Sequence, residues 1–144
     1  MIQCTRKFRS TSTKEEFIMH CTVTCETENI IYLLECAICD LQYIGQTKRK
    51  LKIRMNEHRS DSNNRTGFSL SRHLNSTNHH NAFDKLKVTI IEHNPNWDNE
   101  SRLERERFWI RKFKTFSPIC FFPLLLQRLL PSLTVYISNM TGVL

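Results

Sequence analysis

The sequence lacks the marks of exported and membrane-spanning proteins. Residues 1–10 contain no apolar run of the kind that forms the core of a secretory signal. In the C-terminal region, Pro123, Pro131 and the pair Gln127-Arg128 interrupt the apolar residues well short of the roughly 20 that a transmembrane helix needs. We therefore expect an intracellular protein that does not cross a membrane. No internal repeat is visible.

The missing export signal also argues against a disulfide framework, because disulfides persist mainly in oxidising compartments. The cysteines are then reduced thiols or metal ligands. There are six of them: Cys4, Cys21, Cys25, Cys36, Cys39 and Cys120.

Acidic residues are also in the minority. Asp and Glu total 14 against 21 Lys and Arg, which gives a formal net charge of +7 and a pI of about 9.3. This balance suits a polyanionic partner such as a nucleic acid. It also fits ribosomal and signalling proteins, so charge alone does not decide the function.

The 144 residues are enough for one domain with a modest core. Residues 1–28 are polar and mixed, and we expect a linker or the remnant of a preceding domain. Residues 29–118 carry the folded domain. Residues 119–144 form an apolar tail in which Arg128 is the only charge, as in a read-through or degenerate end.

Hydrophobic patterning predicts three strands and three helices within this domain. The strands are expected at 29–35, 41–45 and 85–92, with a hairpin tip at 36–40. A first helix runs from Thr47, as N-cap, to about Arg59. A short helix covers 69–74, and a last helix opens at Asn99 or Ser101 and ends at Pro118.

Four residues have the spacing of a metal knuckle. Cys36 and Cys39 are in C-x2-C spacing, and His73 and His79 are in H-x5-H spacing. A Cys2His2 set is what tetrahedral zinc prefers, and the long spacer between the two pairs favours a structural clamp. The spacing alone leaves open that these are small buried cysteines and surface histidines.

Two tyrosines, Tyr32 and Tyr43, fall in neighbouring predicted strands and can project to one face. A phenol near a metal-bound water can help to remove its proton, although a tyrosine in a strand most often serves packing alone. Gly45 ends the second strand, where it can adopt backbone conformations closed to other residues. The pattern becomes specific because Arg54 and Glu106 follow in order.

The first helix is strongly basic, with Glu57 as its one acid. Arg54 shares a face with His58, four residues later, and its planar guanidinium can stabilise charge on phosphoryl oxygens. The other bases either contact a phosphate backbone or form a solvated face. The predicted DNA-contacting residues are Lys48, Arg49, Lys50 and Lys52.

Glu106 falls inside the apolar stripe of the last helix, whose other members are Leu103, Ile110 and Phe113. A carboxylate on a core-facing stripe is costly unless something compensates it. A divalent cation such as Mg²⁺ (or Mn²⁺) does so and leaves a bound water available as nucleophile. The alternative is a rim glutamate that pairs with Arg102 or Arg107.

Together these motifs resemble the GIY-YIG nuclease family, in particular the endonuclease domain of Penelope-like retroelements. The similarity covers roughly residues 29–118. The matching segments are Ile30-Ile-Tyr-Leu-Leu-Glu-Cys-x2-Cys39, Gln42-Tyr-Ile-Gly-Gln-Thr47, Leu51-x2-Arg54-x3-His58, His73-x5-His79, Arg105-Glu-x-Phe-Trp-Ile110 and Thr115-x2-Pro118.

The resemblance implies an α+β fold, a small three-stranded antiparallel sheet flanked by helices. It also implies the site: Tyr32 and Tyr43 as the motif tyrosines, Gly45 as the motif glycine, Arg54 and His58 at the phosphate, and Glu106 as the Mg²⁺ ligand. The Cys/His pattern of Penelope-type members strengthens the zinc expectation. The implied activity is metal-dependent nicking of DNA for a retroelement, with the element's reverse transcriptase as a partner and the nucleus as the location.

Two positions depart from the family pattern. The first motif reads Ile-Ile-Tyr, without its glycine, as is usual for the retroelement branch. The more serious departure is that Ile119-Cys120-Phe121 stands where the family has a Gly-Leu-Asn ending. Two alternatives therefore stay open. The chain could be a catalytically inactive nucleic-acid-binding remnant of a polyprotein, or a zinc-stabilised interaction domain with incidental basicity.

Overall fold

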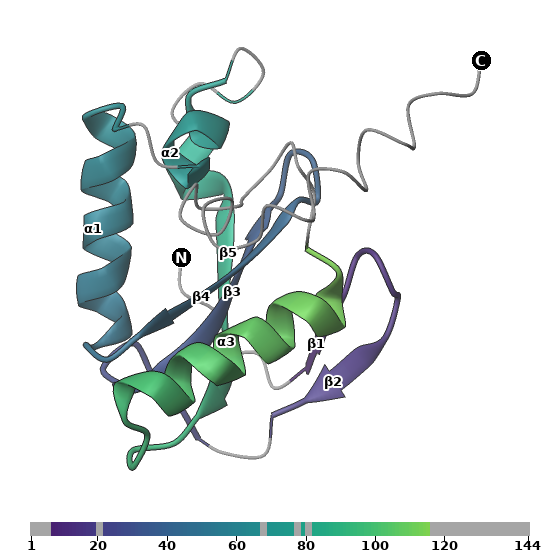
Figure 1. Cartoon of the computed structure of the whole chain (residues 1–144). Helices are drawn as coiled ribbons and strands as arrows, with labels where there is room; N and C mark the ends of the chain where they lie inside the picture. Colours follow the sequence, from purple (N-terminus) through teal and green to yellow (C-terminus); the bar gives the residue numbers. More distant parts are fainter. Residues whose placement is uncertain (1–6, 20–21, 67–68, 77–78, 80–81, 116–144) are drawn as a thin grey trace, which may run out of the picture.

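A three-stranded antiparallel sheet, in the order β4-β3-β5, forms the centre of the computed structural model (Figure 1). The structure describes residues 7–19, 22–66, 69–76, 79 and 82–115. This sheet, with helices packed around it, confirms the predicted α+β fold class. Its strands are β3 (Ile30–Cys36), β4 (Gln42–Thr47) and β5 (Leu86–His93).

The central strand β3 is a nearly continuous apolar run because it has a neighbour on each edge and is covered on both faces. Six of its seven residues are buried, all but Glu35. In the β3–β4 hairpin Tyr32 pairs with Gly45 and Leu34 with Tyr43. Asp40, at φ 58°, supplies the left-handed residue that closes the hairpin turn.

Two helices, α1 (Leu51–Asn63) and α2 (Ser69–Leu74), lie side by side along one side of the sheet (Figure 1). The predicted bounds of α2 are confirmed, but the predicted N-cap of α1 is wrong. Thr47 still pairs with Ile30 in the sheet, and its hydroxyl accepts a hydrogen bond from the Arg49 backbone N–H at 3.0 Å. It therefore stabilises the strand-to-helix turn, and α1 begins after Lys50.

The last helix, α3 (Asn99–Phe113), crosses the front of the sheet (Figure 1). Asp98 is its N-cap and accepts from the Ser101 backbone N–H at 2.7 Å. The helix ends at Lys114, which is left-handed. The buried face of α3 differs from the apolar stripe that the sequence predicted. The buried residues are Arg102, Trp109 and Phe113, whereas Leu103 and Ile110 are half-buried.

Residues 7–19 pack on the core, although the sequence favoured a linker or remnant for 1–28. Strands β1 (Lys7–Arg9) and β2 (Glu16–Ile18) form a hairpin. One aromatic from each strand, Phe8 and Phe17, contacts the rings of Trp109 and Phe113 at centroid distances of 5.3–6.1 Å. Two aromatics in a polar segment are too few for a periodicity signal, yet they dock the hairpin on α3.

Some sequence-based expectations fall on residues outside the described ranges. These are Pro118 as the end of the last helix, the apolar tail 119–144 and the segment Ile119-Cys120-Phe121. The division of the chain into three regions stays a prediction. Among the helices that are described, none is long and apolar enough to cross a membrane.

Candidate active site

Tyr32 stands at the centre of a hydrogen-bonded cluster between β3 and α1. Its hydroxyl is 2.8 Å from His58 Nε2 and accepts a hydrogen bond from Arg54 Nε at 3.3 Å. A guanidinium can only donate, so the Tyr32 oxygen accepts from Arg54, whereas the donor between Tyr32 and His58 depends on the tautomer of the imidazole. Arg54 and His58 reach the same phenol because they lie one helical turn apart on α1.

The second tyrosine joins this cluster through its place in the β3–β4 hairpin. The ring of Tyr43 lies 6.4 Å from that of Tyr32 and 6.1 Å from that of His58, centroid to centroid. Gly45 makes room for both phenols. A Cβ added at Gly45 would lie 2.6 Å from Cζ of Tyr32 and 2.8 Å from Cε1 of Tyr43. Gly45 does not have positive φ, so the need is for space and not for the backbone freedom that the sequence suggested.

Glu106, on α3, lies close enough to this cluster to interact electrostatically with Tyr43 and Arg54. Burial raises the pKa of its carboxyl to about 7, against the opposing charges of Arg54 and Arg107 and a hydrogen bond from the Gln46 backbone. The negative charge of Glu106 in turn raises the pKa of Tyr43. The structure therefore brings together Tyr32, Tyr43, Arg54, His58 and Glu106, as the sequence predicted.

Burial sets the protonation of this cluster. It raises the pKa of Tyr32 well above 10 and that of Tyr43 to about 12. Burial, helped by the charge of Arg54, lowers the pKa of His58 to about 4. Near neutral pH both phenols are protonated and His58 is neutral. Neither phenol therefore stands ready as a phenolate.

The predicted DNA-contacting bases next to α1 are mostly engaged with acids. Arg49 lies 2.5 Å from Glu57, which also holds Arg54 at 2.9 Å. Lys50 and Lys52 both pair with Glu26, at 3.2 and 2.5 Å. Glu26 comes from the segment before β3 and so is not apparent from the helix sequence. Lys48 is exposed.

Sequence reasoning named Arg102 only as an alternative partner of Glu106 and missed its burial, since the residue is 3% exposed. It donates to the side-chain oxygens of Gln46 and Asn29, both at 2.6 Å, and of Asn99 at 2.8 Å. It thereby ties the start of α3 to the sheet. The signal was present: Arg102 is four residues before Glu106, on the same helical face. It was overlooked because the apolar stripe was placed one position away.

A second cluster joins the β3–β4 turn to α2 and the loop beyond it. One ligand atom from each of Cys36, Cys39, His73 and His79 lies within 4.8 Å of the other three. Tetrahedral zinc, at its usual bond lengths, holds such atoms about 3.3–3.8 Å apart. Nε2 of His79 is buried with no hydrogen-bond partner in the described structure. The donor set and this orphaned nitrogen fit a metal ion.

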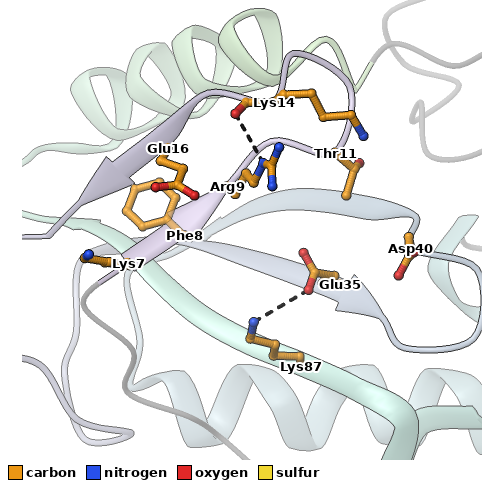
Figure 2. Close-up of a pocket in the computed structure, with 9 residues that line it drawn as sticks. All are labelled: Lys7, Phe8, Arg9, Thr11, Lys14, Glu16, Glu35, Asp40 and Lys87. Carbon is orange, nitrogen blue, oxygen red and sulfur yellow. Dashed lines mark hydrogen bonds and ion pairs between the residues drawn. The ribbon is translucent and has the colours of Figure 1, made fainter.

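A cavity of about 450 Å³ lies elsewhere, between the β1–β2 hairpin and the sheet. Figure 2 shows charges of both signs around it, with Lys87 paired to Glu35. Its lining contains none of the five clustered residues. The chemistry is therefore to be sought at the cluster on Tyr32 and not in this cavity.

Comparison with known proteins accounts for this arrangement. The family model of the GIY-YIG catalytic domain matches residues 28–118. The chain belongs to the GIY-YIG family. No curated protein matches the chain.

Two solved structures support the GIY-YIG fold. The catalytic domain of the homing endonuclease I-TevI is 22% identical, with a TM-score of 0.52, over 66% of this chain and 96% of that chain. A glutamate-to-alanine mutant of the catalytic domain of the intron endonuclease I-TevI, also 22% identical, has a TM-score of 0.54 over 68% and 94%. At this identity the likeness concerns the fold, which agrees with the sheet and helices described above.

Proposed function

We propose that this GIY-YIG chain is a divalent-metal-dependent DNA endonuclease. One observation carries the proposal: two phenols, a guanidinium, an imidazole and a carboxylate converge from β3, β4, α1 and α3. These groups supply proton transfer, charge stabilisation and metal binding, the three needs of phosphodiester hydrolysis. The likeness to a homing endonuclease points to DNA as the substrate.

Glu106 is the residue that would hold the metal, Mg²⁺ or Mn²⁺. Its oxygen donors suit these hard cations, which bind through few carboxylates and keep several waters. The pKa of about 7 reflects a carboxylate desolvated by burial, and a cation restores the lost stabilisation of its charged form. When bound, the metal supplies Lewis-acid stabilisation of the phosphodiester.

Side chains of the protein itself carry out the remaining catalytic roles. Arg54, held by Tyr32 and Glu57, is pre-oriented to stabilise negative charge on the phosphoryl oxygens. Tyr43 is half-buried and meets the attacking water, whereas Tyr32 is fully buried. The hydrogen bond of Tyr32 counteracts the rise in the pKa of Tyr43, and Tyr32 in turn lies 2.8 Å from His58 Nε2. These neighbours thereby position Tyr43 to assist in removing the proton of the water.

The four-residue Cys/His cluster is proposed as a structural zinc site. Cys36 ends β3 and Cys39 lies in the turn that follows, while His73 lies on α2. A zinc ion there ties the sheet to the helical layer. It lies at the end of the strand that carries Tyr32, so it supports the cluster without taking part in the chemistry.

We further propose that the nuclease serves a retroelement of the Penelope-like kind, nicking target DNA in the nucleus for the element's reverse transcriptase. The support is the combination of Ile-Ile-Tyr at the first motif with the cysteine and histidine pairs, which now meet in space. Co-purification of the chain with a reverse transcriptase expressed beside it tests the partnership. No association, with both proteins folded, contradicts it.

A plasmid assay tests the central proposal. The parent protein is expected to convert supercoiled plasmid to the nicked form with Mg²⁺ and not without it. Glu106→Gln keeps the shape of the side chain and removes the charge, and should abolish nicking while the protein stays folded. Equal nicking by both proteins would point to a contaminating nuclease. DNA binding without nicking by the parent would favour an inactive nucleic-acid-binding remnant.

A further inference from the structure

The bases of the α1 region and those of α3 differ in their surroundings. Of the four predicted DNA-contacting residues, Arg49, Lys50 and Lys52 form ion pairs with Glu57 or Glu26. A paired base gains less from a phosphate, because the carboxylate already neutralises part of its charge and repels the anion. The α1 region is thus a weaker anion surface than its sequence suggests.

Two exposed bases on α3 and one at its C-cap have no such partner. Arg107, Arg111 and Lys114 are exposed, and no ion pair within the described residues engages them. Arg107 and Arg111 lie one turn apart on one side of α3, and Lys114 follows as the left-handed C-cap residue of the helix. By contrast, Arg105 and Lys112, on another side of α3, pair with Glu92 and Glu15.

This row starts at the candidate active site. Arg107 follows Glu106 directly, and its charge acts on the Glu106 carboxyl. From there the row leads away along the C-terminal half of α3, towards the β1–β2 hairpin (Figure 1). The exposed acids Glu100 and Glu104 lie in the N-terminal half of the helix. A DNA strand that passes Glu106 and follows α3 is therefore attracted by the bases towards the C-terminal end of the helix. It is repelled by the acids towards the N-terminal end.

We propose that Arg107, Arg111 and Lys114 form the surface that contacts the DNA phosphate backbone beside the scissile phosphate. This inference rests on the proposed endonuclease function and adds the direction of the strand. The backbone runs from Arg54 across Glu106 and then along the C-terminal half of α3. Exposed, unpaired bases in a row are suited to backbone contacts, which fix the position of the duplex but carry no sequence preference.

Two double variants with the same change in net charge test the assignment. Arg107→Gln with Arg111→Gln removes two unpaired bases, and Lys50→Gln with Lys52→Gln removes two paired bases. Affinity for a short labelled duplex is measured by fluorescence anisotropy over a range of salt concentrations, without added divalent ions. Plasmid nicking by the parent protein is measured in parallel, and circular dichroism checks that each variant is folded.

The α3 double variant is expected to lose about tenfold or more in affinity. Its salt dependence should flatten by about 1 in slope for each phosphate contact removed. The α1 double variant is expected to lose less on both measures. Arg107→Lys with Arg111→Lys keeps the charge and should bind nearly as the parent does, which separates a charge effect from lost packing.

The outcomes distinguish this inference from the function on which it rests. If the parent nicks DNA but the two Gln variants lose affinity equally, or the α1 variant loses more, the α3 surface is refuted and the endonuclease stands. If the parent neither binds nor nicks DNA, both proposals are refuted.

Discussion

The two polar clusters of this protein are stabilised in different ways. In the cluster on Tyr32, protein groups satisfy one another: the phenol accepts from Arg54 and shares a hydrogen bond with His58, and Glu57 holds Arg54. In the Cys/His cluster, four metal-binding groups face one another, and the buried Nε2 of His79 has no partner in the described structure. The first cluster is satisfied by protein groups alone, whereas the donor set of the second fits a metal ion.

This difference has a consequence for mutation. A change in the Tyr32 cluster should alter chemistry and leave the fold in place, since the sheet and α1 are held by apolar packing. A change in the Cys/His cluster should lower stability, because it removes the link between the β3–β4 turn and α2. The predictions below test this separation.

The largest expected effect follows loss of the metal at the Cys/His cluster. Structural zinc contributes about 10–16 kcal/mol of apparent binding energy in zinc-finger peptides, energy that is coupled to folding. We expect about one zinc per chain by elemental analysis, and a large drop in melting temperature after chelation or in Cys39→Ser. Cys25→Ser is the control, because Cys25 is half-buried and lies outside the cluster. Zinc-free protein that melts at the same temperature with and without chelator would contradict the site.

The next largest effect is on catalysis, from Arg54→Ala. Removal of a charge-stabilising group of this kind typically costs about 10²–10³-fold in rate. Nicking should fall by that factor, with the melting temperature changed little. Arg59→Ala is the matched control on α1, since Arg59 is exposed and 3.7 Å from Asp84. Similar losses in both variants would mean that Arg54 has no special part in the reaction.

The fold could be predicted largely from local patterns. The apolar run of β3, the alternation of β5 and the short α2 each show their periodicity in the sequence, and the structure agrees. Thr47 misled because a Ser or Thr before a helix can cap a turn as well as the helix. The β1–β2 hairpin was missed because its contact with α3 is made by two rings far apart in sequence.

The sequence predicted which residues meet at the candidate site, but not which residues surround and pair with them. The order Tyr, Tyr, Arg, Glu identified residues that meet in space. The pairing of Lys50 and Lys52 with Glu26 depends on where the segment before β3 runs, and no pattern within α1 shows it. The partners of Arg102 are equally remote in the sequence: Asn29 directly precedes β3, and Gln46 lies on β4.

Gly45→Ala is expected to disturb the Tyr32 cluster and leave the Cys/His cluster intact, with a smaller effect than Arg54→Ala. The added methyl would meet the rings of Tyr32 and Tyr43 at 2.6–2.8 Å, so both phenols must shift. Overpacking of this kind costs about 1–3 kcal/mol, and displacement of catalytic groups by about 1 Å can cost about 10²-fold in rate. Nicking should fall while the zinc content stays at one per chain. Full activity in Gly45→Ala would show that the phenol positions are not critical.

The smallest expected effect is a pH dependence of the free energy of unfolding. It arises from His58, in the Tyr32 cluster. Burial and the charge of Arg54 lower the pKa of His58 from 6.5 to about 4 in the folded protein. Between these two values the unfolded chain binds a proton at His58 and the folded protein does not. Stability from this residue is therefore complete above about pH 6.5 and is lost as pH falls towards 4.

The change is expected to be about 1–3 kcal/mol across that range. His58→Gln keeps a hydrogen-bond acceptor for Tyr32 and cannot titrate. Urea unfolding of the parent and His58→Gln proteins at several pH values measures the difference between them, in which the shared contribution of the Cys/His cluster cancels. His93→Gln, at the end of β5 and outside the cluster, is measured beside them as the matched substitution. Parallel pH profiles for the parent and His58→Gln proteins would show that His58 is protonated equally easily in both states, and that the Tyr32 cluster is open to water.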